Sequence, residues 1–146
     1  MKILVINGPS LNLLGKRDPS IYGTKTLDEI IQGLTSYLEE KGADLACFQS
    51  NHEGAIIDEL HNAMGCFDGI LINPGAYSHY SYAIRDAIES IGIPTVEVHL
   101  SDIHNRESFR AVSVIEPVCI AQVSALGEKS YYVAADILLS KIDENR

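Results

Sequence analysis

The stretch KILVIN at residues 2–7, followed at once by Gly8-Pro9, indicates the fold most directly. Its central residues are all apolar and lack the alternation of a strand with one wet face, so the stretch is typical of a strand buried on both sides. Glycine and proline then end the strand. Similar apolar runs recur at residues 45–49, 69–72, 94–98 and 118–123. The sequence therefore predicts five buried strands.

Segments with the period of an amphipathic helix lie between these strands. Helices are expected from about residues 26, 50 and 79, and a last one over about residues 130–142. Thr26 with Glu29, and Ser50 with Glu53, have the spacing of a capping box, which predicts where the first two helices begin. The glycines placed to end the first three helices are Gly42, Gly65 and Gly92.

Alternating strands and helices predict a parallel sheet with right-handed crossovers and helices on both faces. Five such strands suit the flavodoxin-like α/β order 2-1-3-4-5. The length of 146 residues suits one domain over residues 1–146, and neither a repeat nor a linker interrupts it.

Composition narrows the classes of function. Eleven Lys and Arg against twenty Asp and Glu give a net charge of −9, which argues against nonspecific binding of nucleic acid or anionic membrane. No apolar run approaches the ~20 residues that span a bilayer. The apolar run near the start of the chain is also too short for a signal peptide. The three cysteines form no disulfide framework. A soluble cytoplasmic protein is expected.

Ligands of open parallel sheets bind at the carboxyl ends of the strands. The segments expected there are residues 7–25, 49–52, 73–79 and 99–110. The first is long for a loop of a compact domain and is broken by glycines and prolines, which indicates a functional loop. We interpret its second half, residues 17–24, as a mobile lid.

A phosphate-binding loop is disfavoured. Gly8 and Gly15-Lys16 resemble such a loop, but six residues separate the glycines where the motif has four. Arg17 also stands where the motif places a Ser or Thr for magnesium.

A metal site is disfavoured as well. His99, Asp102 and His104 follow a strand end, but their spacing does not require the imidazoles to converge, and no cysteine pair supports them. His52-Glu53 lacks the second histidine of a zinc-binding helix.

Basic residues near the end of the fourth strand point to an anionic or polyhydroxylated ligand. Arg106 and Arg110 are four apart and would share one face of a short helix. They could be a solvated surface pair, but in an acidic protein a local positive site at a strand end favours ligand binding. His99 is either a structural histidine or a site residue beside the backbone N–H groups of Leu100 and Ser101. Asn73 starts either a plain turn or a polar anchor.

Several motifs together resemble the type II 3-dehydroquinate dehydratases, from the first strand to the last helix. They are NGP at 7–9, LLGKRDP at 13–19 with Tyr22-Gly23, QSNHEG at 49–54, NPGA at 73–76 with His79 and Arg85-Asp86, EVHLS at 97–101, and Arg106-Glu107 with Phe109-Arg110.

The resemblance implies a flavodoxin-like enzyme with neither metal nor cofactor, assembled as a homododecamer of trimers. Its reaction removes water from 3-dehydroquinate through an enolate to give 3-dehydroshikimate, on the shikimate route to chorismate and aromatic amino acids. The same step in quinate catabolism is an alternative. So is a non-catalytic binding protein, although no packing reason demands Tyr22, Arg17 and His99 on loops. A flavin-binding protein would need a Ser/Thr-rich first loop, which this chain lacks.

By resemblance, Tyr22 is the base, Arg17 its activator and His99 the acid that protonates the leaving hydroxyl. A free tyrosine is only about 0.1% ionised at pH 7, and a nearby arginine favours the phenolate. The resemblance makes Asn73 an anchor for the water that stabilises the enolate. Leu100 and Ser101 match the carboxylate site.

The resemblance also assigns His79, Asp86 and Arg110 to the substrate hydroxyls. His79 and Asp86 are seven residues apart on one predicted helix, about 10 Å along its axis, so we expect Asp86 to complete a neighbouring subunit's pocket. A surface pair with an arginine is the alternative for Asp86.

Three residues are expected to support the site. Glu97 would orient His99, Arg106 would add positive charge, and Ser10 replaces the asparagine usual in the family. Asp102, in place of asparagine, and Ala111-Val112, in place of a histidine-rich pair, also depart from the family pattern.

Overall fold

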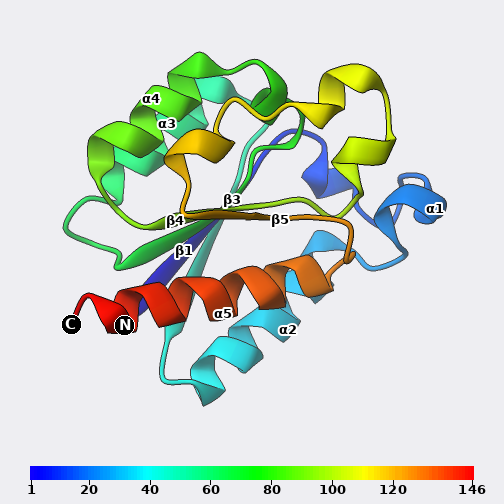
Figure 1. Cartoon of the computed structure of the whole chain (residues 1–146). Coiled ribbons are helices and arrows are strands. Elements are labelled where there is room, and N and C mark those ends of the chain that lie inside the picture. Colours follow the sequence, from blue (N-terminus) through cyan, green and yellow to red (C-terminus); the bar gives the residue numbers. More distant parts are fainter.

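Five parallel strands form one sheet in the order β2-β1-β3-β4-β5, in a computed structural model that describes residues 1–146 (Figure 1). This is the order predicted from the sequence. The strands are β1 (Lys2–Asn7), β2 (Asp44–Gln49), β3 (Gly69–Asn73), β4 (Thr95–Val98) and β5 (Ala121–Val123). Asn7 and Asn73 are register partners at the carboxyl ends of β1 and β3, the edge of the sheet where the site lies.

Helices cover both faces of the sheet, as predicted. Figure 1 shows α3 (Glu53–Asn62) and α4 (Tyr82–Ile91) on one face, and α2 (Leu27–Glu40) and α5 (Lys129–Glu144) on the other. Successive residues of β1 alternate between two apolar clusters: Ile3 and Val5 pack toward α2 and α5, and Leu4 and Ile6 toward α3 and α4. This division explains why the strand is apolar throughout.

The two predicted capping boxes have different outcomes. Thr26 and Glu29 form the complete reciprocal box at the start of α2. The box predicted for Ser50 and Glu53 is wrong, because His52 caps α3 and the Ser50 hydroxyl accepts from its N–H. The Glu53 carboxylate instead accepts from the Ser81 hydroxyl, which belongs to the neighbouring helix start.

Two further element boundaries differ from expectation. The third long helix begins at Tyr82 rather than at His79, because Ser81 caps it, and His79 lies in the preceding 3-10 turn η2 (Gly75–His79). The fifth strand begins at Ala121 rather than at residue 118, because Pro117 places residues 116–118 in the 3-10 turn η5 (Glu116–Val118). Proline lacks the N–H that a ladder needs.

Glycines and prolines were expected to exclude helix from the first loop, and a short helix was considered only for Arg106 and Arg110. The first loop holds η1 (Leu11–Leu13) and α1 (Pro19–Tyr22), and α1 begins at proline, which suits a first helical position. Arg106 and Arg110 do not share one helix face: Arg106 follows η3 (Ile103–Asn105), and Arg110 lies in η4 (Ser108–Ala111).

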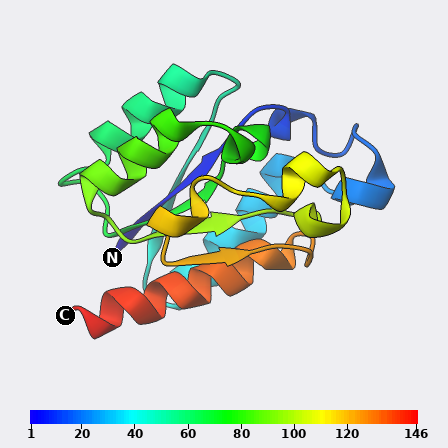
Figure 2. The ribbon, with the colours of Figure 1, turned by 45° about the horizontal axis from the view of Figure 1, so that its top comes forward.

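These loops gather at one end of the sheet. In both Figure 1 and Figure 2, the blue segment with α1 and the yellow segment near residue 110 lie at the same end of the molecule, away from the two termini. Gly8 allows the close approach of the β1 and β3 loops, since a Cβ there would lie 2.6 Å from the Pro74 backbone. No helix has the length and apolar character needed to cross a membrane.

Candidate active site

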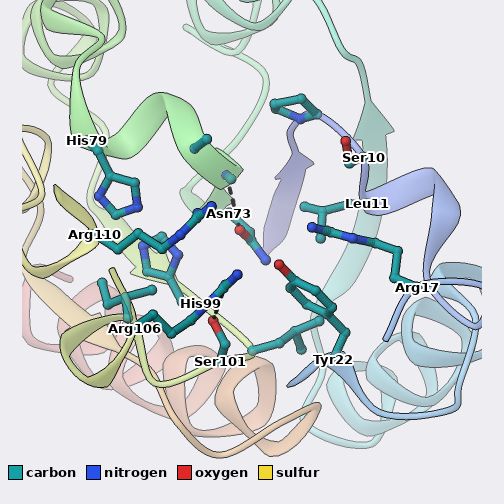
Figure 3. A pocket seen from close by; sticks show the side chains of 15 residues that line it. Ser10, Leu11, Arg17, Tyr22, Asn73, His79, His99, Ser101, Arg106 and Arg110 are labelled. Carbon is teal, nitrogen blue, oxygen red and sulfur yellow. Dashed lines mark hydrogen bonds between the residues drawn. The ribbon is translucent and has the colours of Figure 1, made fainter. Parts of the chain in front are cut away.

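A cavity of about 250 Å³ opens at the carboxyl ends of β1, β3 and β4 (Figure 3). It is lined by Pro9, Ser10, Leu11, Arg17, Tyr22, Asn73, Gly75, Ala76, His79, His99, Leu100, Ser101, Ile103, Arg106 and Arg110. Three of the four segments expected at this edge therefore contribute directly. The fourth, residues 49–52, supports the first loop: Gln49 Nε2 donates to the Gly8 carbonyl, and the Ser10 N–H donates to Asn51 Oδ1.

Tyr22 is flanked by two guanidinium groups. The Arg17 Cζ lies 3.7 Å from the centroid of the Tyr22 ring, and the Arg106 Cζ lies 5.3 Å from it. In Figure 3 the Tyr22 hydroxyl points into the cavity, toward Asn73. The two guanidinium groups are within cation–π distance of the ring. This arrangement suits a tyrosine that acts as a base.

His99 is held from behind by a buried carboxylate. Its Nε2 lies 2.5 Å from Oε2 of Glu97, a residue with no exposed surface. The Ser113 hydroxyl donates to the same carboxylate at 2.8 and 2.9 Å. Because a carboxylate accepts, it places a proton on Nε2 and leaves Nδ1 for proton exchange in the cavity. Glu97 itself does not line the cavity.

His79 lies beside His99, with nearly parallel rings whose centroids are 6.3 Å apart. Its Nδ1 lies 2.8 Å from the carbonyl of Val112, which can only accept, so Nδ1 carries the proton. Burial lowers the pKa of the His79 imidazole, despite the opposing effect of that hydrogen bond. Neutral His79 therefore offers Nε2 as an acceptor.

The cavity is cationic although the chain is acidic. Arg17, Arg106 and Arg110 line it, and no carboxylate does. Arg106 Nη1 donates to the Ser101 hydroxyl at 3.2 Å, and Arg110 Nε donates to the Glu107 carboxylate outside the lining. A small anion with hydroxyl groups is the ligand that this lining fits best.

Asp86 is the one predicted binding residue that lies away from the cavity. It is exposed on α4, and the revised start of that helix removes His79 from the helix on which the two were expected to be aligned. The Asp102 carboxylate accepts hydrogen bonds from the His104 N–H and from the Asn105 side chain. Both donors belong to η3, so the carboxylate is used in local contacts.

The residues discussed as metal ligands have other partners. His104 Nε2 contacts Gln122 Oε1, while His99 contacts Glu97. The structure gathers no group of three His, Cys, Asp or Glu side chains suited to a metal ion.

Sequence reasoning missed several residues behind the cavity. Asn73 contacts Tyr131, which contacts Asn7, and Ser113 contacts Glu97. Tyr131 lies in an apolar helical stripe and resembles an ordinary core residue. Ser113 lies 16 positions from its partner Glu97, so sequence spacing did not indicate that contact. Asn7 did carry one, because it ends a strand at the site edge.

The comparisons with known proteins agree over nearly the whole chain. The family model of dehydroquinase class II matches residues 1–139. A 3-dehydroquinate dehydratase of Clostridium perfringens is 54% identical over 97% of this chain and 99% of its own, and one of Bacillus cytotoxicus is 52% identical over 98% of each. The crystal structure of a type II dehydroquinase from Butyrivibrio crossotus superposes with a TM-score of 0.93 at 51% identity, covering 95% of this chain and 97% of that one.

Fold and site together define an α/β enzyme of the flavodoxin-like type with a small cationic pocket at the sheet edge. The chain belongs to the type II dehydroquinase family.

Proposed function

We propose that this protein is a 3-dehydroquinate dehydratase, a hydro-lyase that converts 3-dehydroquinate to 3-dehydroshikimate through an enolate, on the shikimate route to aromatic amino acids. The observation that carries the proposal is one cavity lined both by Tyr22, which two arginines flank, and by His99, which contacts the buried Glu97. The chain's near-complete match to dehydratases supports it.

Tyr22 takes the first step as a base. The phenolate removes a proton from the carbon next to the substrate's ketone, and the electron pair of that C–H bond forms the enolate. Arg17 is stacked on the Tyr22 ring at 3.7 Å and places a positive charge beside the base. Since both residues lie in the segment of α1, one movement of that segment would deliver them together and exclude water.

His99 completes the elimination as an acid. As the enolate collapses, the carbon–oxygen bond to the departing hydroxyl breaks, and His99 supplies the proton that makes it water. Glu97 stabilises the charged imidazole and fixes its orientation at 2.5 Å. Asn73 stabilises the enolate, directly or through a bound water.

The cationic lining binds the substrate. The backbone N–H groups of Leu100 and Ser101 and the Ser101 hydroxyl receive the carboxylate, with Arg106 beside them. Nε2 of His79 accepts from a substrate hydroxyl, and Arg110 donates to another.

The assembly proposed is a homododecamer built from trimers, in which Asp86 reaches a neighbouring subunit's pocket. Asp86 is exposed on α4, and large apolar side chains at the start of that helix and in the η4 loop are exposed as well: Tyr80, Tyr82, Phe109 and Val112. Exposed apolar side chains of this size favour burial against another chain.

Residues 1–146 act as one catalytic domain. Three unpaired cysteines support a reducing, cytoplasmic setting.

An absorbance assay tests the function. Purified protein mixed with 3-dehydroquinate should develop the ultraviolet absorbance of the conjugated product. If the protein binds 3-dehydroquinate in calorimetry while no absorbance develops, it is a binding protein and not a dehydratase.

A further inference from the structure

A chain of buried hydrogen bonds lies directly behind the cavity. Asn73 Nδ2 donates to the Tyr131 hydroxyl at 3.1 Å, and that hydroxyl donates to Asn7 Oδ1 at 2.5 Å. Tyr131 has no exposed surface, and the two asparagines are 1% and 3% exposed. Only Asn73 lines the cavity, so the chain connects the site to the first turn of α5.

The direction of these bonds is determined by chemistry. Burial raises the pKa of the Tyr131 hydroxyl, which therefore keeps its proton and must donate it. Its acceptor is Asn7 Oδ1, which leaves only the lone pairs of the hydroxyl facing Asn73. On its other side, Asn73 Oδ1 accepts from the Gly75 N–H at 3.3 Å (Figure 3).

Both contacts select the same orientation of the Asn73 carboxamide. In the flipped orientation, the Asn73 oxygen would face the oxygen of the Tyr131 hydroxyl, whose proton is already donated to Asn7. The Asn73 NH2 group would then face the Gly75 N–H, which is also a donor. Neither contact would be a hydrogen bond. One Nδ2 hydrogen is used by Tyr131, and no protein group accepts the second. The second hydrogen is therefore a free donor on a residue that lines the cavity, and the Tyr22 hydroxyl points toward this residue (Figure 3).

We propose that Tyr131 is a positioning residue of this enzyme: with Asn7 behind it, it holds the Asn73 carboxamide so that an N–H donor, and not the oxygen, is available to the developing enolate. This inference rests on the proposed dehydratase function. Donors fixed in place before reaction stabilise an oxyanion without reorganisation, so the effect belongs to turnover and not to substrate binding.

The first experiment compares two tyrosines that are neighbours on α5. Tyr131→Phe removes the hydroxyl and keeps the buried ring. We expect kcat to fall about 10- to 100-fold, less than the loss of an oxyanion donor itself, with KM for 3-dehydroquinate within about twofold of wild type. Tyr132→Phe is the matched control, since Tyr132 does not line the cavity, and its kcat should be unchanged.

A double-mutant cycle tests whether Tyr131 acts through Asn73. Tyr131→Phe should lower kcat in the wild-type background but by less than about twofold in an Asn73→Ala background. A merely structural role would lower the melting temperature without this coupling. Equal losses of kcat in both backgrounds, or an unchanged kcat in Tyr131→Phe, would overturn the inference.

A second variant keeps the inference testable if Tyr131→Phe does not fold. Asn7→Ala removes the acceptor, so the Tyr131 proton can turn toward Asn73, and kcat should fall in the wild-type background but not in Asn73→Ala. An unchanged kcat in Asn7→Ala would then overturn the inference. An inactive wild type would overturn the proposed function and this inference with it, whereas an active wild type with unaffected variants would overturn the inference alone.

Discussion

Ser10 has a left-handed backbone, with φ 68° and ψ −2°, where the first loop leaves β1. This conformation costs a non-glycine residue about 1–2 kcal/mol, and asparagine tolerates it better than serine does. We therefore expect Ser10→Asn to raise the free energy of unfolding by about 0.5 kcal/mol. Urea unfolding measures the change. Ala125, with φ 70° and outside the pocket lining, is the matched position, and Ala125→Asn should give a similar gain. A loss of stability in both variants would contradict this account.

His79 makes stability depend on pH. Because burial lowers its pKa in the folded state, the unfolded chain binds the proton more readily below about pH 6.5. Its contribution to stability is therefore present above pH 6.5 and is lost as the pH falls through the lowered pKa. Urea unfolding between pH 8 and 5 should show that the wild type loses more stability than His79→Gln. Parallel curves would exclude this role.

At the scale of elements, α2 depends on a local device at its first turn. The Glu29 N–H donates to the Thr26 hydroxyl, and the Glu29 carboxylate accepts from the Thr26 N–H. Thr26→Ala should cost about 1 kcal/mol of unfolding free energy, measured in urea. Thr35→Ala on the same helix is the control. Its hydroxyl bonds only to the Ile31 carbonyl one turn earlier, so its removal should cost less than the cap. Equal costs would show that the box adds nothing.

The starts of α2 and α3 show why some helix boundaries were predictable and others were not. Thr26–Glu29 and Ser50–Glu53 have the same sequence pattern, yet only the first forms the box. The Ser81 hydroxyl, 28 residues further along the chain, donates a hydrogen bond to the Glu53 carboxylate instead. Local patterns predict local partners, and they fail where the folded chain supplies a better one.

The site divides in a similar way. Asn73 and His99 were predictable because Asn73 ends a buried strand and His99 follows one, and parallel strands end at one edge of the sheet. Tyr22 and Arg17 came from the family resemblance of the first loop. Tyr131 was not predictable, because its role depends on a contact over 58 residues inside the core.

At the scale of the whole molecule, the position of Asp86 outside its own cavity supports a shared site. Inactive Tyr22→Phe and Asp86→Ala proteins, unfolded and refolded together in equal amounts, should regain activity. If each site takes Tyr22 from one chain and Asp86 from a neighbour, random mixing restores about a quarter of the sites. Each protein refolded alone is the control. If the mixture forms hybrids, detected by mass spectrometry of the assembly, and remains inactive, Asp86 does not complete a neighbouring pocket.

The most direct test of the central claim is the turnover of Tyr22→Phe on 3-dehydroquinate, with binding measured in parallel by calorimetry. The variant keeps the ring against which Arg17 stacks and loses only the oxygen assigned as the base. We predict that kcat falls by about 10²- to 10⁴-fold while the substrate still binds. An unaltered kcat would show that Tyr22 is not the base and would contradict the mechanism.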